Sequence, residues 1–453
     1  MRSIALFLLA AVSAAPSLAQ PAPPATFQSG DTVAIIGDSI THGRKWHRYV
    51  YNYYLTRFPD RQVRFVNLGI AGDSAGGAVR RLDWDILPNR PNVAAIFLGM
   101  NDVGRGNYAP GEPTEAVLKA RQAALDNYAK NMDELSQKLL ANGVQRLVFI
   151  TPSPYDDTAD IGENFPGVNG ALARCGQIGR ELADKYHGSV IDLNGPMTAL
   201  NLEHQKTDPK FTVIGPDRVH PGDLGMMVIA YYFLIGQNAP ALVSRVAIAD
   251  GKADTANADL TNLKTTDQGL SFDLLEKSLP WPIEASARPA LDLVPLEQNL
   301  NQQQFAATVP AGTYRLTIDN QPVGDYTAEA LKAGLNLALN DKTPQYQQAL
   351  KVWQTNEQRS ALEIRIRTMA QIQAIIKPRG VNEDDPAAAE ASFNEWLSRV
   401  GESMHPYFKS QFNVYKSTRT DLPNLKQQIE TLQQQLWQLN QPQPHHYELT
   451  RLP

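Results

Sequence analysis

Short apolar runs, each followed by a glycine or a polar turn, recur through the first half of the chain and limit the folds open to it. They have the length and composition of parallel strands buried on both faces, and segments with helical periodicity separate them. The runs are Val33–Ile36, Val63–Leu68, Val93–Leu98, Arg146–Ile150 and Val190–Leu193. This alternation predicts a doubly wound α/β fold around a parallel sheet.

Ser39, Gly72 and Asn101 each fall just past the carboxyl end of a predicted strand. Folds of this kind place their sites at that edge of the sheet. At Ser39 the strand gives way to a helix, so its hydroxyl should be exposed beside backbone N–H groups that can hold an anion. The alternative is that Ser39 only caps the helix.

A further pair of polar residues lies near the end of the α/β pattern. Asp217 and His220 are three residues apart, on one side of a helical turn, where the carboxylate can hold the imidazole in one tautomer. The uncharged stretch Leu224–Ser244 follows. It could be read as a membrane span, but its Gly, Gln, Asn and Pro residues favour a buried helix that closes the fold.

Together these residues resemble the SGNH (GDSL-like) hydrolase family in four blocks that follow the family's order. Gly37–Ser39 matches the nucleophile block, Gly72 the glycine block, Asn101 the asparagine block, and Asp217 with His220 the D-x-x-H block. The resemblance covers roughly residues 31–240. It implies a flavodoxin-like three-layer α/β/α sandwich, and the chain has no G-x-S-x-G elbow of the ordinary α/β-hydrolases.

The resemblance also implies a mechanism. Ser39 attacks an acyl carbonyl, His220 takes and returns the proton, and Asp217 orients His220. The reaction needs no cofactor and no metal ion. The expected substrates are carboxylic esters.

An oxyanion hole completes the implied site. The resemblance assigns it to the backbone N–H groups of Ser39 and Gly72 and to the side-chain amide of Asn101. Glycine suits position 72 because the backbone must approach the substrate, and asparagine offers a donor without charge. Asp38 and Asp102 are expected to support these loops.

Other titratable residues near the blocks are expected to be structural. His42 and His47 are predicted at the surface, although His42 could line the cleft, and Arg80 and Arg81 are predicted on a solvated helix face. An acidic loop after the fourth strand could bind a cation or a polyol, or could be an ordinary polar loop; it contains Asp156, Asp157 and Asp160. No spacing of His, Cys and Asp indicates a structural metal.

The N-terminus and the composition predict export. Residues 1–19 have a positive start, an apolar core and small residues before Gln20, as a secretory signal does, although an uncleaved anchor is the alternative. Residues 20–30 are predicted to be a flexible lead-in. The single cysteine, Cys175, excludes an intramolecular disulfide and is expected to be buried. The net charge of −5 gives no indication of nucleic-acid binding.

The second half of the chain departs from the α/β pattern. We expect the hydrolase domain over residues 31–244, a β-rich accessory element over 245–325, a helical region over 326–441 and a tail over 442–453. Residues 245–256, at the start of the β-rich element, are expected to be a linker or a domain edge. An apolar stripe over 422–439 is expected to pack within this domain, and a free oligomerising coil is the alternative. Four tryptophans could stack on sugars if exposed, or could belong to the core: Trp281, Trp353, Trp396 and Trp437.

The sequence therefore predicts an exported serine esterase, periplasmic or extracellular, that acts on an acylated small molecule or polysaccharide. Removal of O-acetyl groups from carbohydrate is favoured, with the accessory region walling one side of the cleft. Lipid esterase or lysophospholipase activity and thioesterase activity remain alternatives. So does a catalytically inactive, polysaccharide-binding envelope protein. No transmembrane segment is expected in the mature chain, and the oligomeric state is left open.

Overall fold

The computed structural model describes residues 25–453, so the predicted signal at 1–19 lies outside the described residues. Its first half is built on a five-stranded parallel sheet with the order β2-β1-β3-β4-β5. This is the flavodoxin-like order, as predicted. The strands are β1 (Thr32–Gly37), β2 (Arg64–Gly69), β3 (Val93–Phe97), β4 (Arg146–Ile150) and β5 (Ser189–Ile191).

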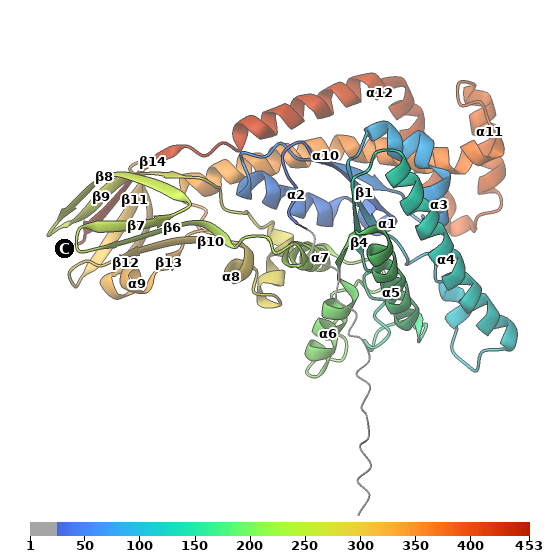
Figure 1. Cartoon of the computed structure of the whole chain (residues 1–453), viewed down its shortest axis with the longest axis horizontal. Coiled ribbons are helices and arrows are strands. Elements are labelled where there is room, and N and C mark those ends of the chain that lie inside the picture. Colours follow the sequence, from blue (N-terminus) through green and yellow to red (C-terminus); the bar gives the residue numbers. More distant parts are fainter. Residues whose placement is uncertain (1–24) are drawn as a thin grey trace, which may run out of the picture.

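Helices cover both faces of the sheet, which confirms the three-layer α/β/α sandwich (Figure 1). One face packs on α2 (Lys45–Arg57) and α7 (Asp223–Gly236). The other packs on α3 (Ala75–Arg80), α4 (Glu115–Ala141) and α5 (Val168–Tyr186). The short α1 (Ser39–His42) follows β1, and α6 (Asn194–Gln205) follows β5.

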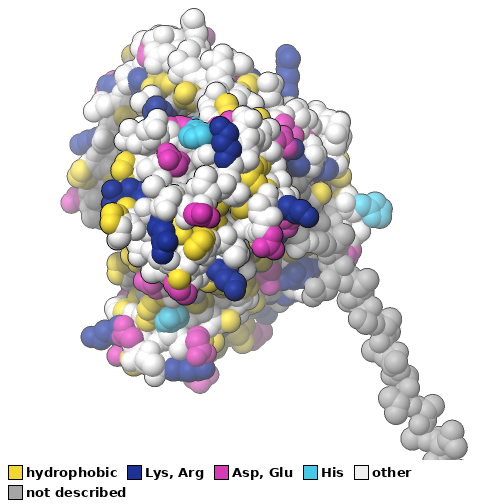
Figure 2. Space-filling model, turned by 90° about the vertical axis from the view of Figure 1, so that its left-hand side faces the viewer, with side chains coloured by type: hydrophobic (Ala, Val, Ile, Leu, Met, Phe, Trp, Pro, Cys, Tyr) yellow, Lys and Arg dark blue, Asp and Glu magenta, His cyan; other side chains and the backbone are white. Residues whose placement is uncertain are grey.

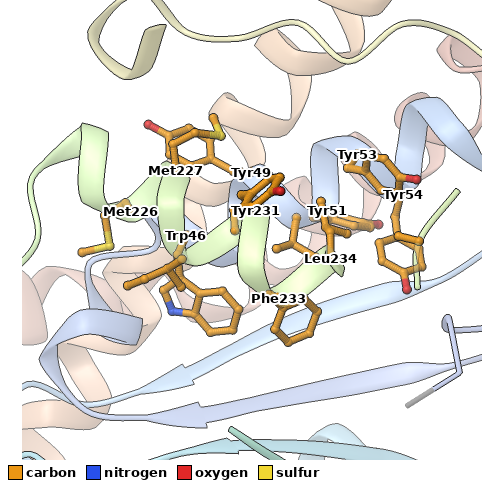
Figure 3. Close-up of a cluster of buried hydrophobic side chains, with 14 of the residues drawn as sticks. Trp46, Tyr49, Tyr51, Tyr53, Tyr54, Met226, Met227, Tyr231, Phe233 and Leu234 are labelled. Atoms are coloured by element: carbon orange, nitrogen blue, oxygen red, sulfur yellow. The ribbon is translucent and has the colours of Figure 1, made fainter. Parts of the chain in front are cut away.

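Helix α2 is buried on nearly all sides, because the sheet, α7 and the long helix α10 (Pro344–Ile376) each cover one of them. Figure 3 shows its aromatic side chains interleaved with those of α7, with Trp46 and Phe233 directed toward the sheet. Phe27 joins this cluster with no exposed surface, and its ring lies 5.3 Å from that of Tyr54. The end of the predicted flexible lead-in is therefore part of the core.

The uncharged stretch after His220 forms the buried helix that the sequence favours. Helix α7 ends at Gly236, and a strand begins at Leu242. Its side chains from Gly225 to Leu234 are buried apart from Tyr232. Within residues 25–453, no helix combines the length and the apolar character that crossing a membrane requires.

A β-region of two sheets follows, and its apolar side chains form one core. One sheet has the order β13-β10-β6-β7 and the other β12-β11-β14-β9-β8. The bounds are β6 (Leu242–Ala249), β7 (Lys252–Ala256), β8 (Ala258–Thr266), β9 (Gly269–Glu276), β10 (Gln302–Ala307), β11 (Thr313–Ile318), β12 (Gln321–Thr327), β13 (Leu335–Asn336) and β14 (Pro444–Arg451).

Two expectations for this half need correction. Residues 245–256 are not a linker, because they belong to the hairpin of β6 and β7, and the change from the α/β fold to the β-region falls just before β6 begins at Leu242. The tail expected at 442–453 contains β14, which lies between β11 and β9. Tyr447 and Leu449 of β14 are buried, and the alternation of apolar and polar residues that places them inside was obscured by the flanking Pro and His residues.

The helical region is dominated by α10 (Pro344–Ile376) and α12 (His405–Leu439), which pack along each other (Figure 1). Helix α10 also contacts α2 and β2. The apolar stripe predicted over 422–439 lies in α12, and its residues Leu425 and Leu436 are buried. Shorter helices are α8 (Leu296–Leu300), α9 (Ala328–Ala333) and α11 (Pro386–Leu397). Of the four tryptophans, Trp281 is fully buried, and Trp353, Trp396 and Trp437 are partly buried.

Helix α10 closes the outer edge of the parallel sheet. Strand β2 is an edge strand, and its outward backbone groups would otherwise be free to pair with another chain. Glu363 of α10 accepts a hydrogen bond from the Asn67 N–H at 2.9 Å, and Arg367 donates to the Asn67 carbonyl at 3.1 Å. Side chains of α10 thus take the place of a neighbouring strand at this point.

The β-region lies at the opposite end of α2 from Ser39. The segment after β9 meets the last residues of that helix: Ser278 donates to the Arg57 carbonyl at 2.8 Å, and the Leu279 N–H donates to the Thr56 carbonyl. The chain then runs back along α2, where Glu284 pairs with Arg48 in the first turn at 2.7 Å. That the accessory region walls one side of the cleft stays a prediction. Figure 2 looks onto the β-region end, where basic and acidic side chains are interspersed.

Candidate active site

The first site segment is the turn from β1 into α1. Asp38 caps the helix, with its carboxylate accepting the Ile40 N–H at 3.0 Å. Gly37 is required there, because a Cβ would lie 2.3 Å from Thr41 Oγ1. Ser39 is thereby the first residue of α1, where a backbone N–H has no partner within the helix.

Ser39, His220 and Asp217 form one hydrogen-bonded row. Ser39 Oγ lies 2.8 Å from His220 Nε2, and His220 Nδ1 lies 2.5 Å from Asp217 Oδ2. The carboxylate can only accept, so Nδ1 carries the proton and Nε2 is free to accept from the serine hydroxyl. The structure thus joins three predicted residues that are up to 181 positions apart.

Asp217 is fixed by its own loop. Its Oδ1 accepts the backbone N–H groups of Val219 at 3.0 Å and His220 at 2.9 Å. Partial burial raises the pKa of this carboxyl, but the hydrogen bonds from the His220 backbone and imidazole outweigh it and hold the pKa below its ordinary value. The side chains of Asp217 and His220 are about half exposed, so the row lies at the surface.

The glycine and asparagine blocks meet at the end of β2. Gly72 has a φ of +81°, which favours glycine, although a Cβ there would touch nothing. The carbonyl of the next residue, Asp73, accepts a hydrogen bond from Asn101 Nδ2 at 2.8 Å. One amide proton of Asn101 is used for this bond, and the second remains for a ligand.

Asp38 and Asp102, the two predicted supporting residues, each accept a hydrogen bond from the backbone of these loops. Asp102 accepts the Ala75 N–H at 2.9 Å and so ties the asparagine block to the start of α3. Burial is the main cause that raises the pKa of Asp38 and of Asp102 to about 7, and the charge of Asp73 contributes to both shifts.

The two histidines near the nucleophile are not at the surface, so that prediction is wrong. His42 and His47 are 9% and 2% exposed. Burial, helped by nearby arginines, lowers the pKa of His42 to about 4, and burial lowers that of His47 to about 3. The neutral His42 accepts the Ala71 N–H on Nδ1 at 3.2 Å, which anchors the glycine block.

Arg81 is a third residue that the sequence placed wrongly. It is 1% exposed instead of lying on a solvated helix face. Its guanidinium contacts Asp73 at 2.8 Å, Asp85 at 2.6 Å and the Leu68 carbonyl at 2.7 Å. Local sequence gives no sign of this, because the partners lie on three different segments.

Arg218 is a site-supporting residue that the sequence reading missed. It lies between Asp217 and His220 with a φ of +63° and is buried. Its guanidinium donates to five backbone carbonyls of the loop 156–163: Asp156, Ala159, Ile161, Gly162 and Glu163. This cage anchors the D-x-x-H turn to the loop after β4.

In the acidic loop after β4, the carboxylate of Asp156 is hydrogen-bonded within the loop. Its Oδ1 accepts hydrogen bonds from Thr158 and Ala159. The part of the chain that the structure describes contains no group of three or more His, Cys, Asp or Glu arranged to hold a metal ion. Cys175 is buried as predicted, and burial raises the pKa of its thiol.

Comparison with known proteins agrees with this fold. The model of the GDSL-like lipase/acylhydrolase family matches residues 35–228. An acetylxylan esterase of Geobacillus stearothermophilus is 25% identical over 223 residues, which cover 46% of this chain and 93% of that protein. The solved structure of a gut microbial diltiazem-metabolizing enzyme is 31% identical, with a TM-score of 0.88, covering 95% of this chain and 99% of the other.

The fold and these matches define an α/β enzyme that hydrolyses esters. The chain belongs to the GDSL-like lipase/acylhydrolase family. The match to the diltiazem-metabolizing enzyme covers 95% of this chain and so includes the β-region and the long helices, which the family model does not.

Proposed function

We propose that the chain is an exported serine esterase that removes acetyl groups from carbohydrate through a Ser39–His220–Asp217 acyl-enzyme mechanism. The observation that carries the proposal is the hydrogen-bonded row, with 2.8 Å from Ser39 Oγ to His220 Nε2 and 2.5 Å from His220 Nδ1 to Asp217. A nucleophile, a base and an orienting acid in this geometry perform acyl transfer on many folds.

In the proposed reaction, Ser39 Oγ attacks the acyl carbonyl while its proton passes to His220 Nε2. Asp217 stabilises the imidazolium, which then protonates the leaving alcohol as the C–O bond breaks. Water attacks the acyl-enzyme by the same route and releases the acid. The oxyanion is held by the N–H groups of Ser39 and Gly72 and the amide of Asn101, each donor contributing about 3 kcal/mol.

Two observations support acetylated carbohydrate as the substrate. The Geobacillus relative, named an acetylxylan esterase, matches 46% of this chain over 93% of its own length. The half-exposed Asp217 and His220 leave the row open, so a bulky alcohol can approach while only the acyl group must fit beside Ser39.

A small-molecule ester is the second candidate. The relative that matches the whole chain, including the β-region and long helices, is named for metabolising diltiazem and not a polysaccharide. A compact substrate would also reach an exposed row without a long groove.

Export is part of the proposal and rests on residues 1–19. The charged start, the apolar core and the small residues before Gln20 are those of a cleaved secretory signal. Fractionation of cells that express the full chain, with N-terminal sequencing, tests it: we expect a chain that begins at Gln20 outside the cytoplasm. An intact N-terminus in the cytoplasm would contradict it.

The activity is tested with p-nitrophenyl esters from acetate to dodecanoate and with acetylated xylan and glucan oligosaccharides, for wild type and Ser39→Ala. We expect hydrolysis of acetate and of acetylated sugars, lost in Ser39→Ala. A preference for long acyl chains would favour a lipid esterase. Activity on p-nitrophenyl acetate with none on any sugar ester would favour a small-molecule ester as the substrate. An inert wild type would favour a binding protein.

A further inference from the structure

Helix α10 is connected to the turn that carries Gly72 by a chain of buried polar contacts. We infer that Arg367 of α10 is a positioning residue for the oxyanion hole, acting on Gly72 and Asn101 through Asp85 and Arg81. The inference rests on the proposed Ser39 mechanism and gives a role in catalysis to a helix outside the matched family region at 35–228.

The first route runs through charged side chains only. Arg367 Nη2 donates to Asp85 Oδ1 at 2.6 Å, and Arg81 Nη1 donates to Asp85 Oδ2 at 2.6 Å. Arg81 Nε then donates to Asp73 Oδ2 at 2.8 Å. Arg367 and Arg81 are 3% and 1% exposed. Each bond is therefore short, charged and shielded from water, which makes the chain stiff.

This route ends on the hole itself. Asp73 directly follows Gly72, so the bond from Arg81 to the Asp73 carboxylate ties this turn to the buried side chains beneath it. The Asp73 carbonyl also accepts from Asn101 Nδ2 at 2.8 Å. A shift of Asp73 therefore moves two of the three proposed oxyanion donors together.

A second route from α10 reaches the same turn through the backbone. Arg367 donates to the Asn67 carbonyl at 3.1 Å, and Glu363 accepts the Asn67 N–H at 2.9 Å. Asn67 Nδ2 donates to the His42 carbonyl at 3.3 Å, and His42 Nδ1 accepts the Ala71 N–H at 3.2 Å. Ala71 and Asp73 thus flank Gly72, and each is tied to α10.

The charge of Arg367 also suits the second route. His42 can accept the Ala71 N–H only while Nδ1 is unprotonated. Burial is the main cause that lowers the pKa of His42 to about 4, and the positive charges of Arg367 and Arg81 contribute to the shift. Arg367 therefore supports the turn by hydrogen bonding and adds to the burial that keeps the imidazole neutral.

A purely structural role is the competing explanation, because Arg367 also covers the edge of β2. Asn356 provides the matched control. It is fully buried in the same helix and donates to Asn52 Oδ1 of α2 at 2.7 Å. It lies eleven residues, or about 16 Å, before Arg367 along α10 and is independent of the first route. Its other partner, Arg359, lies 3.6 Å from Glu363, so Asn356 is two contacts removed from the second route.

The experiment compares Arg367→Gln with Asn356→Ala for hydrolysis of p-nitrophenyl acetate, with melting temperatures measured in parallel. We expect Arg367→Gln to lower kcat by about 10- to 100-fold with KM changed less than about twofold, since misplaced catalytic donors cost rates of this size. Asn356→Ala should lower the melting temperature and keep kcat. A folded Arg367→Gln with kcat within twofold of wild type would overturn the inference.

Two further variants keep the test decisive. Arg367→Lys retains the charge and one donor, so it should fold and give a kcat between those of wild type and Arg367→Gln. A kcat equal to wild type would contradict the claim that the hydrogen bonds of the guanidinium position the turn. In an Asn101→Ala background, Arg367→Gln should cost less than in wild type, because one of the donors it positions is already gone. Full additivity would contradict the coupling.

Failure of the proposed function gives a different result. If wild type hydrolyses no ester, or if Ser39→Ala keeps the activity, the Ser39 mechanism is wrong before Arg367 is considered. If wild-type activity depends on Ser39 and Arg367 has no effect on kcat, only the positioning role is wrong.

Discussion

Replacing Asp217 with asparagine removes the charge at the end of the hydrogen-bonded row and almost nothing else. In the wild type, Oδ1 accepts the N–H groups of Val219 and His220, and Oδ2 faces His220 Nδ1. The asparagine oxygen should keep the two backbone bonds, which turns its NH₂ group toward Nδ1. Nδ1 must then accept, so the proton moves to Nε2, which can no longer take a proton from Ser39.

The size of the effect follows from these contacts. Turning the amide over to restore the correct tautomer would break two backbone hydrogen bonds of about 1 kcal/mol each, so the competent form is disfavoured roughly 30-fold. Losing the carboxylate beside the imidazolium costs about a further tenfold, a modest factor because water screens this half-exposed pair. We expect kcat to fall by about 300-fold, less than the roughly 10⁴-fold loss typical of a buried triad.

The assay is kcat for p-nitrophenyl acetate, with Ser39→Ala defining the background rate. Asp208→Asn is the matched control: it makes the same charge change at an exposed carboxylate that also accepts a backbone N–H, from Lys210, and should keep full activity. If Asp217→Asn keeps more than a tenth of wild-type kcat, the argument from the tautomer is refuted.

Three other changes test the structure around the row. Phe27→Ala should lower the free energy of unfolding by about 3–5 kcal/mol in a urea titration, since it empties a fully buried site; a loss under 1 kcal/mol would mean that this segment is not docked. Arg218→Met should cost about 3 kcal/mol and lower kcat, because the cage of carbonyls loses its donor, and unchanged values of both would contradict that anchor. The pKa of Asp38 is raised to about 7, so its contribution to stability is complete below pH 3.8 and is lost as the pH rises through 7. Asp38→Asn should therefore lose about 2 kcal/mol less stability than wild type between pH 5 and 8, and equal losses would argue against the raised pKa.

The α/β half could be predicted because its signals are local. Each buried strand is a short apolar run, and the residue after it identifies the sheet edge where the site forms. Ser39, Gly72 and Asn101 could be assigned to one edge in this way, since β2, β1 and β3 are neighbours in the sheet. His220 and Asp217 needed the four-block resemblance, because nothing in their own segment fixes their distance from Ser39.

The errors have two causes. Arg81 looks solvated because polar residues usually are, although its partners Asp73 and Asp85 lie only eight and four residues away. Other parts of the structure depend on partners far away in the sequence, as where Arg367 meets Asp85 across 282 positions. β14 looks like a tail because its neighbours, β9 and β11, lie more than 100 residues earlier. Local periodicity carries no information about such partners.

The long helices cannot be treated as an appendage to the α/β domain, because the edge of β2 is incomplete without them. Asn67 would present an unpaired N–H and carbonyl at that edge, and the carboxylate of Asp85 would lose one of the two arginines that offset its burial. The side chain of Arg367 meets both requirements, because it bonds to the Asn67 carbonyl and to Asp85. The residue that covers the sheet edge is therefore also the one that braces the turn at Gly72. Changes in α10 at this point should therefore reach the active site even though no residue of α10 belongs to the hydrogen-bonded row.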